Sequence, residues 1–257
     1  MMLNQMIRVV EKAGEMIRDV HSVYGNITEK SSHIDVVTQY DTAVEAFLRR
    51  ELLKLMPEAG FLGEESAREE GSTQWTFIVD PIDGTANFVR DFGHSNISVA
   101  LAKNGVSEYG VVYNPYRGEL FAAQRGKGAF CNSRPIRVSS SDPAHGILLC
   151  GSTAYDRELT DRHFAIMRAL YDRVGDFRRL GAAALDLCYV AAGRAEVFYE
   201  CRLRPWDIAA GSLILTEAGG TVTQMDGTAL NVLQNCSVFA TNAACSGLIE
   251  VVREFPA

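Results

Sequence analysis

Hydrophobic residues recur at helical spacing in the first part of the chain. Over residues 1–20 they alternate with charged positions, which predicts an amphipathic helix of a folded domain. A second helix is predicted over about 42–55, because Pro57 cannot continue it. Residues 61–66 read as a strand that turns into a loop, and residues 76–80 read as a buried strand.

The pattern changes after residue 95. Apolar and polar positions alternate up to about residue 132, and Asn104-Gly105, Arg117-Gly118 and Lys127-Gly128 mark turns. We therefore predict an antiparallel meander of three or four strands. Beyond 139–143, strand and helix patterns alternate. The predicted strands cover 146–152, 195–200, 221–225 and 237–241, and the predicted helices cover 159–172, 181–193, 207–220 and 244–255.

These two textures predict two halves. Residues 1–140 are expected to form an α+β half and residues 141–257 an α/β half, with the boundary near 139–143.

Composition narrows the class of protein. The 257-residue chain has a net charge of −7, which argues against a broad nucleic-acid-binding surface. Its six cysteines include no Cys-x-x-Cys pair, so they fit neither a disulfide scaffold nor a zinc ribbon. We expect reduced cysteines in a cytoplasmic protein. No apolar run approaches the roughly 20 residues of a membrane span.

The segment DPIDGTANF, residues 80–88, places two carboxylates three residues apart. We expect the preceding strand to end at Asp80, because Pro81 has no N–H for the ladder. Gly84 permits a tight turn, and Thr85 can begin a helix whose free N–H groups bind an anion. The segment therefore predicts two carboxylates beside a set of amide donors.

Carboxylates held a few ångströms apart repel each other unless a cation neutralises them. Magnesium suits such a site, because it takes oxygen ligands and phosphate oxygens. Glu64, after an apolar run, and Asp207, before a long apolar helix, add two acidic positions beside Gly or Pro. The simpler alternatives are a turn with an Asp cap at 80–84 and an N-cap at Asp207.

Three motifs, GEES (63–66), DPIDGTANF (80–88) and WDIAAG (206–211) followed by TEAGG, resemble the inositol monophosphatase family of magnesium-dependent, lithium-sensitive phosphatases. The resemblance extends from about residue 28 to 245. It implies a layered αβαβα sandwich of the inositol monophosphatase/fructose bisphosphatase type. The N-terminal half would carry most metal ligands, and the C-terminal half would supply Asp207 and substrate contacts.

The resemblance also implies two or three Mg²⁺ ions. Glu64, Asp80 and the backbone carbonyl of Ile82 would hold the first ion, and Asp80, Asp83 and Asp207 the second. Glu64 would support a third, water-rich site. The ions would clamp the phosphate and activate a water for attack on phosphorus.

Catalytic assistance is implied for three residues: Glu64, Thr85 and Asp41. Thr85 and Asp41 would help to activate the water, although Asp41 could equally cap the helix that follows it. The substrate contacts implied by the resemblance are Gly84, Thr85, Gly181, Ala182, Ala183, Glu200 and Asp207.

Three further positions have alternative interpretations. Glu200 alone would read as a solvated charge at a strand end. Arg202 and Arg204 would favour a second anionic group or simply lie on a loop. Asp186 stands where some relatives have a neutral amide, which leaves the substrate contacts of that helix open.

The expected function is a Mg²⁺-dependent phosphomonoesterase acting on inositol monophosphate or a similar small polyol phosphate. Ala86-Asn87 after the threonine resembles the inositol branch. The alternatives are a fructose 1,6-bisphosphatase, a phosphatase of 3′-phosphoadenosine nucleotides or NADP, and an interaction protein that uses this fold. The resemblance further implies a homodimer, and we expect neither a membrane partner nor autonomous nucleic-acid binding.

Overall fold

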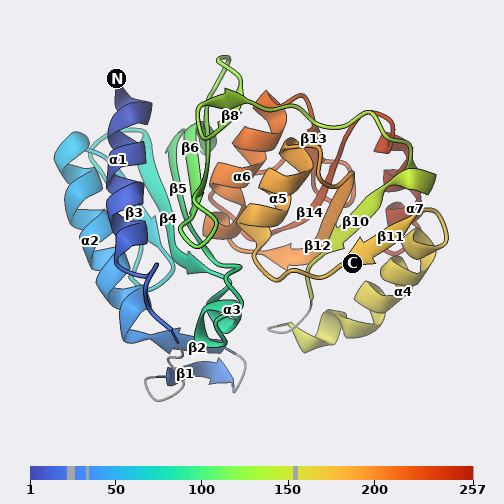
Figure 1. Cartoon of the computed structure of the whole chain (residues 1–257), viewed down its shortest axis with the longest axis horizontal. Coiled ribbons are helices and arrows are strands. Elements are labelled where there is room, and N and C mark those ends of the chain that lie inside the picture. Colours follow the sequence, from blue (N-terminus) through green and yellow to red (C-terminus); the bar gives the residue numbers. More distant parts are fainter. Residues whose placement is uncertain (22–26, 33–34, 153–155, 257) are drawn as a thin grey trace.

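The computed structural model describes residues 1–21, 27–32, 35–152 and 156–256. Five layers of helix and sheet follow one another along the long axis of the molecule (Figure 1). The layered αβαβα order that we expected is confirmed. None of the helices in these ranges is both long and apolar enough to cross a membrane.

The first two layers are a helix pair and a seven-stranded sheet. Helices α1 (Met2–Glu15) and α2 (Gln39–Leu55) pack their apolar stripes on one face of the sheet, as expected from their periodicity. The strand order is β3-β4-β5-β6-β7-β8-β9, and only β3 and β4 pair in parallel. The strands are β3 (Gly60–Gly63), β4 (Trp75–Asp83), β5 (Asn96–Lys103), β6 (Val106–Asn114), β7 (Glu119–Gln124), β8 (Ala129–Cys131) and β9 (Arg134–Pro135).

The hairpin between β5 and β6 confirms the predicted Asn104-Gly105 turn. Both residues have positive φ, 52° and 76°, which asparagine and glycine tolerate better than other residues. Strands β5 to β8 account for the four strands of the predicted antiparallel meander, and the short β9 extends it by one strand.

The third layer consists of α5 (Ala183–Ala191) and α6 (Pro205–Glu217). Both helices are buried almost all round, since they lie between the two sheets and share one apolar core with them. Most of their side chains are therefore apolar, with little amphipathic pattern.

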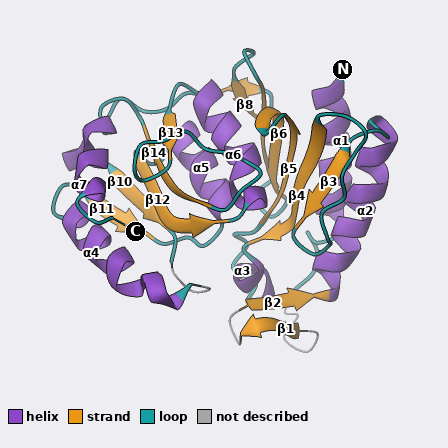
Figure 2. Cartoon of the chain, turned by 180° about the vertical axis from the view of Figure 1, so that it is seen from behind, coloured by secondary structure: helices purple, strands orange, loops and turns teal. Residues whose placement is uncertain are grey.

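The last two layers are a five-stranded mixed sheet and the outer helices α4 (Thr160–Tyr171) and α7 (Ile249–Arg253), seen from behind in Figure 2. The order is β11-β10-β12-β14-β13, with β10 parallel to β11 and β12. The strands are β10 (Ile147–Cys150), β11 (Asp176–Arg178), β12 (Val197–Leu203), β13 (Thr221–Thr223) and β14 (Cys236–Thr241). The proposed division into halves near 139–143 stays a prediction.

Several element boundaries differ from the predictions. Helix α2 begins at Gln39 rather than Thr42, because Thr38 and Asp41 form a reciprocal capping box in front of it. The predicted C-terminal helix is a 3-10 turn (Ser246–Leu248) followed by the short α7. Residues 35–41 were expected to be extended, and β2 (Asp35–Thr38) lies there. Its partner β1 (Ile27–Ser32) and strand β11 were not predicted.

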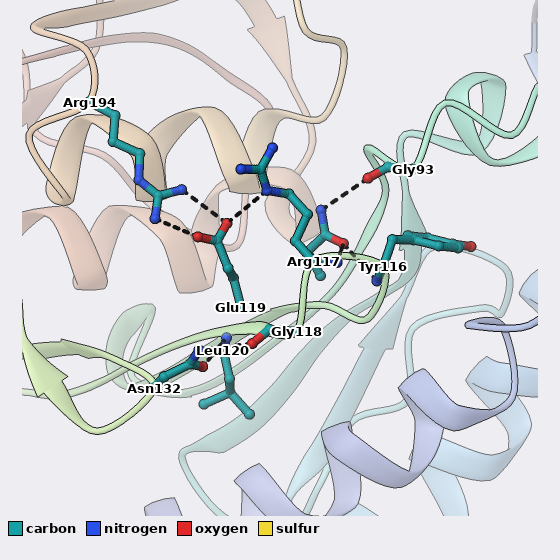
Figure 3. Close-up of polar contacts among 9 residues, drawn as sticks. Gly93, Tyr116, Arg117, Gly118, Glu119, Leu120, Asn132 and Arg194 are labelled. Atoms are coloured by element: carbon teal, nitrogen blue, oxygen red, sulfur yellow. Dashed lines mark hydrogen bonds and ion pairs between the residues drawn. The ribbon is translucent and has the colours of Figure 1, made fainter.

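An ion pair fixes the first sheet against the inner helices (Figure 3). Glu119 at the start of β7 accepts bonds of 2.9 and 2.5 Å from Arg194, which follows α5, and lies 3.3 Å from Arg117 Nε. The Arg194 guanidinium also lies 4.9 Å from the ring centre of Tyr189. These bonds hold the pKa of Glu119 below its usual value, so the pair keeps its charge at neutral pH.

Candidate metal and phosphate site

We predicted from the sequence that strand β4 would end at Asp80, and this prediction is wrong. The strand runs through Pro81 to Asp83, and the pairing shifts so that Asp80 faces Ser98 and Asp83 faces Asn96 of β5. Three steps on one strand oppose two on the other, which is a β-bulge. Pro81 lies within this bulge, where its missing N–H is tolerated.

The bulge brings the carboxylates of the two aspartates of β4, Asp80 and Asp83, close together. The Ile82 N–H donates to Asp80 Oδ1 at 3.0 Å and closes the local turn. One carboxylate oxygen from each of Asp80, Asp83 and Asp207 lies within 4.8 Å of the others. Asp207 comes from the other half of the chain, in the first turn of α6. It is not the N-cap: that position is Arg204, whose N–H donates to Asp207 Oδ2 at 2.7 Å.

The electrostatics of this cluster favour a cation. Burial raises the pKa of Asp80 well above its usual value, and the charges of Glu64, Asp83 and Asp207 raise it further. Burial and then the charge of Asp83 raise the pKa of Asp207 in the same way. Glu64 shares a hydrogen bond with Asp80. Four acidic groups therefore compete for protons in one small volume.

Asp83 is the most firmly held of these carboxylates. Its carboxylate accepts three hydrogen bonds: one of 2.7 Å from Asn96 Nδ2, one of 3.2 Å from the Ala183 N–H and one of 2.9 Å from the Ala184 N–H. These bonds lower the pKa of Asp83 against the larger effect of burial, which raises it. Ala183 and Ala184 begin α5, so Asp83 also caps the first turn of that helix.

Thr85 and Asp41, the pair for which the resemblance implies help in activating water, lie within hydrogen-bond distance of each other. Gly84 takes a left-handed conformation with φ of 84°, and Thr85 begins the short helix α3 (Thr85–Val89). The Thr85 hydroxyl lies 3.3 Å from Asp41 Oδ1 and 3.0 Å from the Ile82 carbonyl. Asp41 is the third residue of α2, not its N-cap, which is Thr38. Burial raises the pKa of Asp41 to about 6.

Glu45 supports the loop of Glu64, a role that no local sequence pattern indicates. Its Oε2 accepts the Glu65 N–H at 2.8 Å, and the side chain is only 4% exposed. A Cβ at Gly63 would lie 2.4 Å from the same oxygen. Asp41 and Glu45 are four residues apart, so one face of α2 supplies both.

The acidic cluster lines a cavity of about 310 Å³. Glu200 lines the same cavity and accepts the Ser152 N–H at 3.1 Å. Gly151 makes room for this carboxyl group, because a Cβ there would lie 1.9 Å from Glu200 Oε2. The residue is not a solvated strand end: it lies inside β12, and burial raises its pKa to about 8.

Three further ionisable residues, Asp186, Arg179 and Arg202, line the cavity. Asp186 is 1% exposed, burial raises its pKa well above the usual value, and its Oδ1 has no hydrogen-bond partner among the described residues. Arg179, which the sequence analysis did not single out, donates to Ser152 Oγ at 3.1 Å. Arg202 is engaged by Asp156 and Glu158 at 2.7 and 2.9 Å.

The cavity therefore collects every implied metal ligand and substrate contact. Asp41 lies just behind it, in contact with Thr85. The cavity lining includes Glu64, Asp80, Ile82, Asp83, Gly84, Thr85, Arg179, Gly181, Ala182, Ala183, Asp186, Glu200 and Asp207.

The donor set fits a hard divalent cation. Every donor is a carboxylate or carbonyl oxygen, the type of ligand that Mg²⁺ prefers. Four carboxyl groups lie together, and the raised pKa values of Asp80, Asp83 and Asp207 show how costly their charges are without a counter-ion. One carboxylate oxygen of Asp80 and one of Asp207 lie within 4.8 Å of each other, close enough to ligate one ion.

Comparisons with known proteins agree over the whole chain. A model of the inositol monophosphatase family matches residues 1–256. A Pasteurella multocida protein named Nus factor SuhB is 42% identical over 231 residues, covering 88% of this chain and 86% of that protein. A Mesorhizobium japonicum protein named inositol-1-monophosphatase is 41% identical over 257 residues, covering 98% and 96%. The structure of a Thermotoga maritima IMPase has a TM-score of 0.89 at 33% identity, covering 98% and 97%.

Proposed function

The chain belongs to the inositol monophosphatase family, and we propose that it is a Mg²⁺-dependent phosphomonoesterase acting on inositol monophosphate or a similar small polyol phosphate. The observation that carries this proposal is the convergence of Asp80, Asp83 and Asp207 within 4.8 Å in the lining of the cavity. Glu200, in the same lining, supplies a carboxyl group suited to hydroxyls.

We assign Glu64, Asp80 and the Ile82 carbonyl to one Mg²⁺ ion, and Asp80, Asp83 and Asp207 to a second. Glu64 also serves a third, water-rich position. The bound ions would supply the positive charge that neutralises phosphate and stabilises the attacking and leaving oxygens.

Thr85 and Asp41 accept the proton that the attacking water loses. The Thr85 hydroxyl can accept from a water and pass its own hydrogen bond to Asp41, 3.3 Å away. With a pKa raised to about 6, Asp41 is a stronger base than an ordinary aspartate and is still mostly ionised at neutral pH. Thr38 keeps that carboxylate in place through its N–H and hydroxyl, at 2.8 and 2.6 Å.

The remaining residues orient the substrate. The N–H groups of Gly84 and Thr85 bind phosphate oxygens, and Gly181, Ala182 and Ala183 line the path to the alcohol. Glu200 and Asp207 bind hydroxyls. With its pKa raised to about 8, Glu200 holds a proton at neutral pH and can both donate to and accept from a polyol.

Phosphate release from a panel of substrates tests this proposal. The panel contains inositol 1-phosphate, fructose 1,6-bisphosphate, 3′-phosphoadenosine 5′-phosphate and NADP, each with and without Mg²⁺. We expect Mg²⁺-dependent release from inositol 1-phosphate, and loss of at least about 10³-fold in Asp80→Asn, because metal charge stabilises the transition state. Asp161→Asn, on the exposed side of α4, is the matched control. Phosphate release mainly from another member of the panel would overturn the proposed substrate. Release from no member would refute the proposed phosphatase activity.

A second candidate function is an interaction protein, because relatives such as the Pasteurella multocida protein are named Nus factor SuhB. Under this reading, binding of a protein partner would survive in Asp80→Asn while phosphate release is lost.

We also propose a homodimer in the cytoplasm. Sedimentation of the purified chain tests the dimer, and a single species of about 28 kDa would refute it.

A further inference from the structure

The side-chain amide of Asn87 joins two distant parts of the chain. Asn87 lies in α3 and is 8% exposed. Its Nδ2 is 2.9 Å from the carbonyl oxygen of His94 and 2.8 Å from that of Leu180, and the Gly181 carbonyl follows at 3.4 Å. Carbonyl oxygens only accept hydrogen bonds, so the amide nitrogen must face them.

Gly84 packs against the same group of atoms. A Cβ at Gly84 would lie 3.1 Å from the carbonyl oxygens of Gly181 and His94, and 3.2 Å from the Ala182 Cβ. Gly84 and Gly181 both have φ of 84°, a conformation that favours glycine. The turn of residue 84 and the segment 180–182 are thus in close contact, and Asn87 bridges them.

Asp83 holds the N–H side of this segment. The N–H groups of Ala183 and Ala184 donate to its carboxylate at 3.2 and 2.9 Å. The carbonyls of Leu180 and Gly181 depend on Asn87 instead. A hydrogen bond contributes about 0.5–1.5 kcal/mol net, so without the amide this half-buried segment would be held less firmly against Gly84.

We propose that Asn87 is a positioning residue that sets the affinity for the alcohol part of the substrate. It holds the segment 180–182 against Gly84, and thereby places Gly181 and its neighbour Arg179 along the cavity that leads to Glu200. Asn87 itself does not line the cavity. This inference deepens the proposed function and depends on it for the kinetic measurement, but not for the exchange measurement.

The kinetic test compares Asn87→Ala and Asn87→Asp with Asn132→Ala. Asn132 also bridges main-chain groups, with bonds of 2.8 and 2.9 Å to Gly118 and Leu120, but far from the cavity lining (Figure 3). We expect the KM for inositol 1-phosphate to rise about tenfold in both Asn87 variants, with kcat and the inhibition constant of inorganic phosphate within about threefold. In Asn132→Ala, all three constants should stay near wild type.

The exchange test needs no turnover. Amide hydrogen exchange of Ala183 and Ala184, followed by mass spectrometry of the metal-free protein, should accelerate about tenfold or more in Asn87→Ala, because the segment opens locally. The same peptides should be unchanged in Asn132→Ala.

Each outcome decides between the inference and its alternatives. Unchanged exchange at Ala183 and Ala184 overturns the clamp. Faster exchange with an unchanged KM, or with KM and the phosphate constant rising equally, overturns the role in alcohol binding. If the wild-type protein hydrolyses no member of the panel, the proposed function fails, while the exchange result still decides whether Asn87 positions the segment.

Discussion

Glu200 carries a carboxyl group that burial keeps protonated over most of the neutral range. Its pKa rises from 4.5 to about 8, so this group contributes stability below the unfolded value, and the contribution is lost as pH rises through the folded value. One unit of pKa corresponds to about 1.4 kcal/mol, so the loss is on the order of a few kcal/mol. Urea unfolding of metal-free protein between about pH 5 and 9 should show this fall, and Glu200→Gln should show a shallower one, because Asp80, Asp186 and Asp207 keep their own raised pKa values. An equal pH slope in both proteins would contradict the assignment.

Single residues differ in how much of their role the sequence reveals. Asp80, Asp83 and Asp207 follow or precede apolar runs beside Gly or Pro, and this context together with the family motifs predicts a metal site. The structure places one carboxylate oxygen of each within 4.8 Å of the others. The roles of Glu45 and Asn87 arise from contacts with residues 20 and 93 positions away. Nothing in their own neighbourhoods announces such pairings, so the structure was needed to find them.

At the scale of elements, α2 and the loop after β3 form one unit. Glu45 on α2 accepts the Glu65 N–H, and a Cβ at Gly63 would reach its carboxylate at 2.4 Å. Gly63→Ala should therefore displace Glu45 and shift Glu64, and weaken Mg²⁺ binding about tenfold, since supporting contacts typically change metal affinity by that order. Calorimetric titration with Mg²⁺ measures this. Gly247→Ala, where nothing lies within 4 Å of the new Cβ, should bind as wild type.

Element types followed from periodicity, whereas their ends depended on local hydrogen bonds. Helices α1, α2, α5 and α6 and the hairpin at Asn104-Gly105 could be predicted from the sequence pattern. The bulge at Pro81 was not, because it requires the register of the neighbouring strand β5. The same reason explains the unpredicted β11, three residues long, which exists only by pairing with β10.

At the scale of the whole molecule, the acidic cluster joins the two proposed halves. Asp80 and Asp83 come from the seven-stranded sheet, and Asp207 comes from α6, between the sheets. Their repulsion opposes this junction when no cation is bound, as the raised pKa values of all three groups indicate. An ion held by ligands from both halves would reverse the effect and stabilise the complete assembly.

Calorimetric melting with Mg²⁺ and with a chelator tests this coupling. Mg²⁺ at about 100 times its Kd should stabilise the wild-type chain by about 2.7 kcal/mol, because only the folded state gathers the ligands. In Asp207→Asn most of this stabilisation should vanish, whereas the metal-free variant should melt at or above the wild-type temperature, since one repelling charge is gone. A lower metal-free Tm would mean that Asp207 matters mainly through its bond to the Arg204 N–H at the start of α6. An unchanged Mg²⁺ response would instead remove Asp207 from the ligand set and leave the ion to the first half alone.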